Sequence, residues 1–433
     1  MSNITDTIRL LNPWWEDEKV SEELARQYKR SFFDKMQEFK KYKQIIILTG
    51  LRRVGKTTLI YQTVKELLNG TDPKRIFYFS FDKEIDDLVE LFENYKELTG
   101  IDYKKEKIFA FFDEITKFKK WASELKLIYD SCPNIKFYIS SSSSINLEEE
   151  AIKNLAGRYF LINVSPLSFK EFLELKGKQK MIKNHRLYSR EIKKEFFSYL
   201  LRSFPETTNW DNELVIKDYL RTTIIDKIIK SDLPERFNNI NKELLYNLIE
   251  LFYKEPGFYL DYDNLSKNLK ISKNTLYTHI FYLEFCYLIR IVKNFRPSTL
   301  STSRKLQRVY PYWWNLAYCY GENNDKILES FVLSTIDGKY YWRNLDKEID
   351  FLKVKGKNIL PIEVKNRERI EERDLSTLKL FMEKYKIKKV LLLYLGDKKI
   401  REFDSKKIEF IPFWKWLLEE KNEKARFTGG DKF

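Results

Sequence analysis

The chain has 433 residues, of which 43% are hydrophobic and 16% aromatic, so it can build more than one hydrophobic core. This composition excludes a largely disordered protein, and the length favours two or three domains. The formal net charge of +15 and the pI near 9.2 favour a polyanionic partner such as nucleic acid, although a lysine-rich solvated surface gives the same balance.

Cysteine usage and the absence of long apolar runs indicate the cellular compartment in which the protein is expected. Cys132, Cys286 and Cys319 lie far apart in the sequence, which argues against a disulfide framework and against a zinc site. The N-terminus lacks the pattern of a secretion signal, and no apolar run approaches the ~20 residues that span a bilayer. We therefore expect a cytoplasmic protein with no membrane partner.

Residue spacing predicts alternating helices and strands in the first third of the chain. Apolar residues at intervals of three and four predict a helix from Glu22 to Tyr42. The apolar run Gln44–Leu48 predicts a buried strand, and Thr57–Leu68 predicts a helix. Further strands are expected at Arg75–Ser80, Ile108–Phe112 and Ile135–Ile139. Strands that alternate with helices predict an α/β fold with a mostly parallel sheet.

The rest of the chain changes character twice. Leu167–Arg236 has helical periodicity and is expected to form a helical lid or connector. Short helices and a strand follow over Asn241–Phe295, and the Ser- and Thr-rich run Pro297–Arg304 predicts a linker. The remaining residues mix helices with short strands, including Glu348–Val354 and Asn358–Lys365.

A glycine loop lies between the first predicted strand and the helix after it. Gly50 and Gly55 permit the backbone to wrap closely around phosphates, so that its N–H groups converge on them. Lys56 is expected to reach the β- and γ-phosphates of ATP, and Thr57 to place its hydroxyl on Mg²⁺. An ordinary glycine turn is the alternative, but it does not explain the acidic pair described next. The predicted nucleotide-binding residues of this loop are Gly50, Leu51, Arg52, Arg53, Val54, Gly55, Lys56, Thr57 and Thr58.

An acidic pair ends another buried strand. Asp113 is predicted to hold Mg²⁺ through its water shell, and Glu114 to orient or deprotonate the attacking water. Ser140 to Ser142, after the next strand, offer a residue to sense the γ-phosphate, and Ser141 is the one assigned to nucleotide binding. Arg158 is the candidate for stabilising charge in the transition state, although a surface or structural arginine fits its spacing equally well. Lys56, Glu114 and Arg158 are thus the predicted catalytic residues.

These motifs resemble those of prokaryotic, especially archaeal, AAA-type ATPases that have a restriction-endonuclease-like C-terminal domain. The resemblance covers nearly the whole chain. Besides the glycine loop, it rests on Asn12-Pro13-Trp14-Trp15, Asp113-Glu114-Ile115, the serines after Ile139, Leu155-Ala156-Gly157-Arg158 and Pro166-Leu167-Ser168-Phe169-Lys170-Glu171-Phe172. It implies an AAA-like sheet in which Arg158 acts as a finger within or between subunits. Relatives commonly have Thr-Gly where this chain has Ser140-Ser141.

We expect a P-loop AAA-like ATPase domain with a helical lid in residues 1–236, a winged-helix domain in residues 237–300 and an α/β restriction-endonuclease-like domain in residues 301–433. Within the second, Asn264–Leu269 and Lys273–Glu284 predict a helix-turn-helix in which Ser272 caps the second helix. Its outer face would carry Lys273, Asn274, Tyr277 and Thr278 toward a DNA duplex. Such modules also brace ATPases through protein contacts alone, so both roles stay open.

A second group of polar residues lies in the last domain. If Gly356-Lys357 forms a two-residue hairpin turn, Asp350 lies opposite Glu363 and Lys365 shares their face. Such a face can bind Mg²⁺ and position a water, as metal-dependent phosphodiesterases require. The pattern resembles the Asp, Glu-x-Lys signature of restriction-like nucleases, and this resemblance adds Glu329 as a third metal ligand. A structural hairpin with a salt-bridged polar face is the alternative.

The sequence therefore predicts an enzyme that hydrolyses ATP with Mg²⁺ and acts on DNA or within a DNA-linked complex, with a second copy or another protein as further partners. The alternative is a nucleotide-dependent switch or assembly scaffold whose C-terminal domain is catalytically silent. Turnover that DNA stimulates would favour the first.

Overall fold

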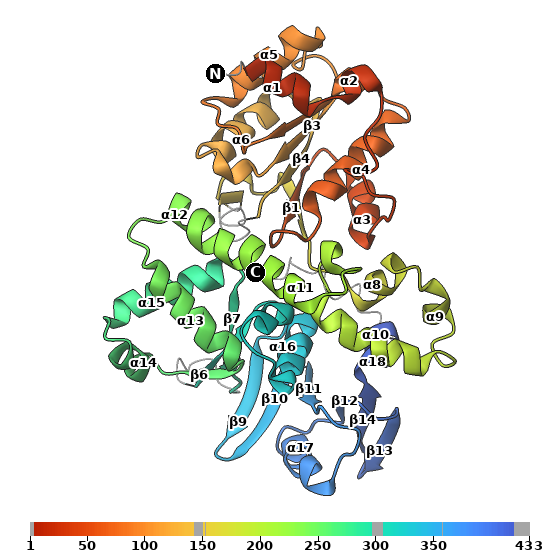
Figure 1. Cartoon of the computed structure of the whole chain (residues 1–433), viewed down its shortest axis with the longest axis vertical. Helices are drawn as coiled ribbons and strands as arrows, with labels where there is room; N and C mark the ends of the chain where they lie inside the picture. The colour runs from red at the N-terminus through yellow and green to blue at the C-terminus, as the bar shows by residue number, and fades with distance from the viewer. Residues whose placement is uncertain (1–3, 143–149, 152, 297–305, 357, 420–433) are drawn as a thin grey trace. The chain divides into compact units, whose positions relative to one another are not determined.

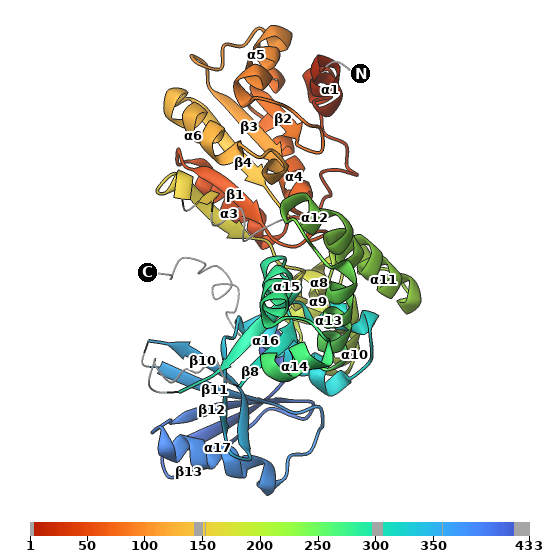
Figure 2. The same cartoon turned by 90° about the vertical axis from the view of Figure 1, so that its left-hand side faces the viewer.

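The computed structural model describes residues 4–142, 150–151, 153–296, 306–356 and 358–419. It divides into two compact units at Pro166 and Leu167 (Figures 1 and 2). The predicted linker Pro297–Arg304, the turn residue Lys357 and the tail after Lys421 lie outside the described residues. In the described part of the chain, no helix is both long and apolar enough to span a membrane.

The first unit is built on a five-stranded sheet in the order β2-β3-β4-β1-β5. Every neighbouring pair is parallel, which confirms the predicted mostly parallel sheet. β5, the last strand in this order, was not predicted, although Tyr159–Ile162 is a short apolar run. The strands are β1 (Ile45–Thr49), β2 (Ile76–Ser80), β3 (Ile108–Asp113), β4 (Ile135–Ser140) and β5 (Tyr159–Asn163).

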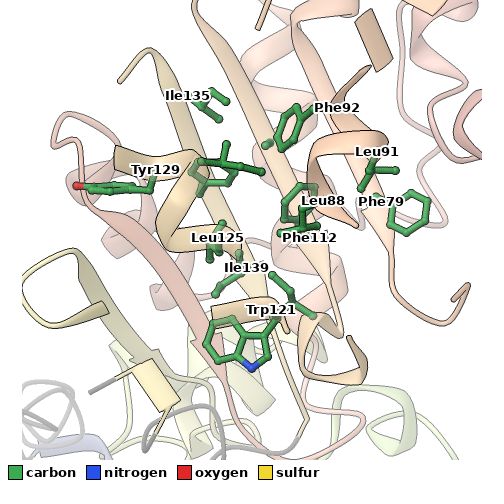
Figure 3. Close-up of a cluster of buried hydrophobic side chains, with 14 of the residues drawn as sticks. Phe79, Leu88, Leu91, Phe92, Phe112, Trp121, Leu125, Tyr129, Ile135 and Ile139 are labelled. Carbon is green, nitrogen blue, oxygen red and sulfur yellow. The ribbon is translucent and has the colours of Figure 1, made fainter. Parts of the chain in front are cut away.

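Helices cover both faces of this sheet (Figure 1). On one face lie α3 (Ser31–Lys40) and α4 (Lys56–Leu68), and on the other lie α1 (Ile4–Leu11), α5 (Leu88–Thr99) and α6 (Trp121–Ser131). The short α2 (Trp14–Asp17) follows α1. Figure 3 shows the core beneath α5 and α6, where side chains of these helices meet strand residues that include Phe79, Phe112 and Ile139. Burial of this apolar cluster stabilises the sheet.

The helix predicted from Glu22 begins only at Ser31, so that prediction was wrong at its start. The segment before Ser31 contacts another helix instead. The Gln62 Nε2 atom of α4 donates to the carbonyl oxygens of Arg26 and Tyr28 at 2.7 and 2.9 Å. Apolar spacing does not reveal such a tertiary hydrogen bond.

The second unit begins with the helices that were expected to form a lid. Residues 221–226 and 228–232 are π-helical, which is a rare conformation that spacing rules do not predict. Ser272 caps α15 by accepting from the Thr275 N–H at 3.0 Å, as predicted. The α-helices are α8 (Phe169–Leu175), α9 (Gln179–Lys183), α10 (Ser189–Leu201), α11 (Glu213–Leu220), α12 (Leu233–Arg236), α13 (Lys242–Lys254), α14 (Tyr262–Asn268), α15 (Lys273–Phe285), α16 (Asn324–Ile336), α17 (Glu372–Lys384) and α18 (Phe413–Glu419).

A nine-stranded mixed sheet runs through the second unit in the order β13-β14-β12-β11-β10-β9-β7-β8-β6. The pairing of Lys355 with Asn358 and of Phe351 with Ile362 is the register that the predicted hairpin requires. The strands are β6 (Phe258–Leu260), β7 (Ile289–Asn294), β8 (Gln307–Pro311), β9 (Tyr340–Asn344), β10 (Lys347–Lys355), β11 (Asn358–Val364), β12 (Lys389–Tyr394), β13 (Lys399–Phe403) and β14 (Lys406–Pro412).

Candidate nucleotide site and carboxylate cluster

The carboxyl ends of three neighbouring strands carry the polar residues of the first candidate site. β1 leads into the glycine loop, β3 ends at Asp113 and β4 ends at Ser140. Because all three strands are parallel, their carboxyl ends meet at one edge of the sheet, where ligands bind in open α/β folds.

Two glycines of the loop adopt conformations that other residues resist. Gly50 has φ +134°, and a Cβ atom added there would lie 2.1 Å from the carbonyl oxygen of Val164. Gly55 has φ +95° and directly precedes α4, whose first residue is Lys56. The loop therefore delivers the backbone to the N-terminus of a 13-residue helix, where N–H groups and the helix dipole favour a phosphate.

Lys56 and Thr57 begin α4 and contact the loop and the end of β3. The buried Lys56 ammonium donates to the carbonyl oxygens of Gly50 and Leu51 at 2.9 and 3.1 Å. The Thr57 hydroxyl donates to Asp113 Oδ2 at 2.8 Å, so the hydroxyl and carboxylate expected to hold Mg²⁺ already touch. The structure thus joins Thr57 to Asp113 directly, and Lys56 lies beside Thr57 at the start of α4.

Asp113 lies in a buried and crowded polar environment. Burial, followed by the negative charge of Glu114, raises the pKa of the Asp113 carboxyl group above its ordinary value. Its Oδ1 atom accepts from the Ser140 hydroxyl, and its Oδ2 atom accepts from the Tyr78 hydroxyl at 3.2 Å. A bound cation would offset the cost of keeping this carboxylate charged. Tyr78 was not predicted, because it lies inside an apolar strand whose pattern reads only as core.

Glu114 is held by the residues that follow β4. Its backbone has φ +53°, and its Oε2 atom accepts from the N–H and hydroxyl of Ser142 at 3.0 and 2.8 Å. Ser141, the predicted sensor, shares a hydrogen bond of 2.6 Å with the Thr116 hydroxyl. The serine run therefore lies against the acidic pair, with Ser140 on Asp113 and Ser142 on Glu114.

A buried arginine that the sequence analysis missed braces the glycine loop. Arg30 donates to the carbonyl oxygens of Val54, Ser165 and Pro166 at 2.8, 2.9 and 3.1 Å. Arg30 thus joins the loop to the segment that follows β5. Val164, the first residue of that segment, also lies against Gly50. An arginine far from the loop in sequence carries no local signal of such a contact.

Replacement of Arg30 by methionine should lower the free energy of unfolding of the first unit by roughly 3 kcal/mol, because three buried carbonyl groups lose a charged donor. Differential scanning calorimetry of the full chain measures the change. Lys29→Met serves as control, since among the described residues Lys29 forms an exposed pair with Glu66 and a cation–π contact with Phe33. Equal transition temperatures in both variants would contradict the bracing role.

Arg158, the predicted arginine finger, lies at the opposite edge of the sheet from the glycine loop. Its carbonyl oxygen accepts from the N–H of Ile45, the first residue of β1, and its guanidinium contacts both carboxylate oxygens of Asp130 at 2.9 and 3.1 Å. Strand β1 lies between Arg158 and the loop, a length of about 16 Å at the usual rise per residue. Arg158 therefore cannot act on the nucleotide of its own chain, and only an action between subunits stays open.

The second candidate site combines β10, β11 and α16. The observed hairpin register places Asp350 level with Glu363, and Asp350 Oδ2 accepts from the Val364 N–H at 2.8 Å. Lys365 donates to Glu363 Oε1 at 2.6 Å. Lys326 donates to both carboxylate oxygens of Glu329 at 2.8 and 3.0 Å. Each of the two glutamates is thus paired with a lysine that lies two or three residues away in the sequence.

The carboxyl groups of this cluster influence one another. Burial and the charge of Asp350 raise the pKa of Glu329 to about 7 and that of Glu363 to about 8. Glu363 Oε2 is buried and has no hydrogen-bond partner among the described residues. As the side chains stand, the described residues contain no group of three acidic, histidine or cysteine side chains arranged to hold a metal ion.

Residues on neighbouring strands extend this cluster, and the sequence analysis had not identified them. The Tyr310 hydroxyl lies 3.3 Å from Glu329 Oε2 and 3.4 Å from Arg308 Nη1. The buried Arg308 in turn contacts Glu348 at 2.6 Å. The Tyr310-Pro311-Tyr312-Trp313-Trp314 segment therefore contributes a tyrosine beside the carboxylates.

Comparison with known protein families divides the chain into three matched segments. Residues 42–173 match the AAA domain, a nucleotide-binding ATPase domain. Residues 193–312 and 326–416 match two domains of unknown function, DUF8612 and DUF4143. The AAA match covers the sheet, the glycine loop, the acidic pair and the serines beside it, and it supports the predicted AAA-type P-loop ATPase.

Three curated relatives are uncharacterized proteins. MJ1544 of Methanocaldococcus jannaschii is 30% identical over 87% of this chain and 88% of its own length. MJ1637 of the same organism is 30% identical over 57% of this chain and 56% of its own length. A protein of Haemophilus influenzae is 26% identical over 90% of this chain and 98% of its own length.

Among solved structures, the chain has low overall similarity to C. elegans PCH-2 and to the ADP form of the Aeropyrum pernix ORC2 protein. The first is 14% identical with a TM-score of 0.23, over 65% of this chain and 66% of that one. The second is 10% identical with a TM-score of 0.33, over 67% of this chain and 93% of that one. These scores are too low to support conclusions about this chain.

Proposed function

This chain belongs to the AAA-domain family that includes MJ1544 of Methanocaldococcus jannaschii, and we propose that it binds ATP with Mg²⁺ and hydrolyses it at the carboxyl edge of its five-stranded sheet. The observation that carries the proposal is the convergence of Lys56, Thr57, Asp113 and Glu114 on one edge. A glycine turn without this function would not need an acidic pair beside it.

The loop fits a triphosphate in two respects. Gly50 occupies a place where no Cβ atom fits, and the N-terminus of α4 offers backbone N–H groups to an anion. Lys56 would exchange its contacts with Gly50 and Leu51 for phosphate oxygens. Mg²⁺ would neutralise phosphate charge when held by Thr57 and by water bound to Asp113. Glu114 would accept a proton from the attacking water. The water oxygen would bond to the γ-phosphorus as ADP leaves.

Phosphate release by the full chain with ATP tests the proposal directly. We expect turnover with Mg²⁺ and none with an excess of EDTA. Parallel reactions with single-stranded and duplex DNA separate the two functional classes: stimulation supports an ATPase linked to DNA, whereas slow turnover that DNA does not change supports a nucleotide-dependent switch. Absence of both binding and turnover would refute the nucleotide site.

Arg158→Ala should lower turnover more than ATP affinity, and only where subunits associate, because the native side chain lies on the far edge of its own sheet. Turnover per chain, measured across a series of protein concentrations, should rise for the native protein and stay flat for the variant. Identical curves for the two well-folded proteins would eliminate the finger and leave Arg158 as the partner of Asp130.

We further propose a second activity class for the C-terminal part: metal-dependent cleavage of a phosphodiester by a restriction-endonuclease-like domain. The observation that favours it is the buried, unpartnered Oε2 atom of Glu363 beside Asp350. Glu329, Asp350 and Glu363 would hold the metal, and Lys365 would lie beside the phosphate. Helices α14 and α15, with strands β6, β7 and β8, support the proposal of a winged-helix module. In the sequence this module lies between the ATPase domain and the nuclease-like domain.

A further inference from the structure

An exposed basic surface in the second unit carries cations that form no ion pair with the described residues. The α9–α10 basic surface consists of Lys180, Lys183, Arg186, Arg190 and Lys194, which lie on α9, on α10 and between them. None of these five side chains forms an ion pair with a described residue, and all five are exposed. Nearby cations differ: Lys176 and Lys178 both contact Glu195. The positive charge of this surface is therefore available to a partner.

Helix α10, which carries part of the α9–α10 basic surface, packs against the C-terminal elements of the second unit. Lys193 of α10 forms an ion pair with Glu368, five residues beyond Glu363. Phe196 of α10 packs edge-on against Phe331 of α16 with ring centroids 5.6 Å apart. These contacts fix α10 in place, while the cations that it contributes to the surface remain exposed.

The outer face of α15, where duplex DNA was first expected, offers less free charge. Lys273 forms an ion pair with Asp263, and the Thr278 hydroxyl donates to the Asn274 carbonyl at 2.9 Å. Tyr277 stacks on Tyr262 with ring centroids 3.9 Å apart. The polar and aromatic groups of this face are engaged within their own helix-turn-helix, so charge attraction favours α9 and α10.

We propose that the α9–α10 basic surface binds the phosphate backbone of duplex DNA. The proposal rests on the DNA-linked part of the proposed function and names its binding surface. Lysine and arginine side chains that lack carboxylate partners release counterions from DNA when they bind phosphates, which gives affinity without sequence preference. Exposed Lys183, Arg186 and Arg190 follow one another at intervals of three and four residues, so a single segment supplies several contacts.

Fluorescence anisotropy with a duplex of about 30 base pairs tests the surface in the full chain at about 50 to 200 mM salt. The variant Lys183→Gln/Arg186→Gln/Arg190→Gln should bind at least about tenfold more weakly, and its log–log salt slope should fall by about 0.9 for each lost phosphate contact. The control Lys267→Gln/Lys270→Gln/Lys273→Gln removes the same charge from α14, α15 and their turn, and should stay within about twofold of the native protein.

Equal losses in the two triple variants would overturn the proposal, because net charge alone would then explain binding. A larger loss in the control would assign the duplex to the helix-turn-helix. No binding by the native chain would overturn both this surface and the DNA link. ATP turnover without DNA, measured on the same samples, should be equal in all three proteins and so separates failure of the nucleotide site from failure of the surface.

Discussion

Replacement of Glu114 by glutamine should leave ATP binding within about twofold of the native affinity and lower hydrolysis by two or more orders of magnitude. Glutamine keeps the shape of the side chain, and its amide oxygen can still accept from the N–H and hydroxyl of Ser142. It cannot take a proton from the attacking water. A hundredfold loss corresponds to about 2.7 kcal/mol of transition-state stabilisation.

Titration with ATP and phosphate release on the same preparation separate binding from chemistry. Glu90→Gln, an exposed change on α5, is the matched control and should keep native turnover. Lys56→Ala should abolish ATP binding itself. Lys56 is the residue of the loop that is assigned to the β- and γ-phosphates, and alanine cannot replace its charge. Native turnover in Glu114→Gln would refute its assigned role.

The sheet and its functional edge were largely predictable because buried parallel strands leave strong local signals. The apolar runs near Ile45, Ile108 and Ile135 all form strands, and the register of the β10–β11 hairpin follows from its turn. In each case, the information lies within a few consecutive residues. The glycine loop is similarly local, because its conformation depends on Gly50 and Gly55 themselves.

The supporting residues were not predictable because their roles depend on contacts between distant segments. Arg30 meets Pro166, and Tyr78 meets Asp113, only after the sheet has formed. Gln62 likewise contacts a non-helical segment more than 30 residues earlier in the chain. The location of Arg158 at the far end of β1 depends on the pairing of β5 with β1, which connects segments more than 100 residues apart. Residue spacing therefore predicts functional side chains better than it predicts the tertiary contacts that position them.

In the C-terminal cluster, Asp350→Asn combined with Glu363→Gln should abolish binding of Mn²⁺ or Mg²⁺ while the hairpin stays folded, because both changes preserve shape. Isothermal titration of the nucleotide-free full chain measures the binding. The control Glu402→Gln/Asp404→Asn removes two exposed carboxylates from the same unit and should bind metal like the native protein. The ATPase should stay active in both variants.

The pH dependence of metal binding gives this prediction a second readout. Since Glu329 and Glu363 have pKa values raised to about 7 and about 8, protons compete with the metal near neutral pH. Metal affinity should therefore rise as the pH increases from about 6 to about 9, as these carboxyl groups lose their protons. No saturable binding even at the upper limit would reduce the cluster to a structural polar face. Saturable binding without cleavage of DNA would instead identify a degenerate nuclease in which Lys326 and Lys365 hold the carboxylates in an inactive arrangement.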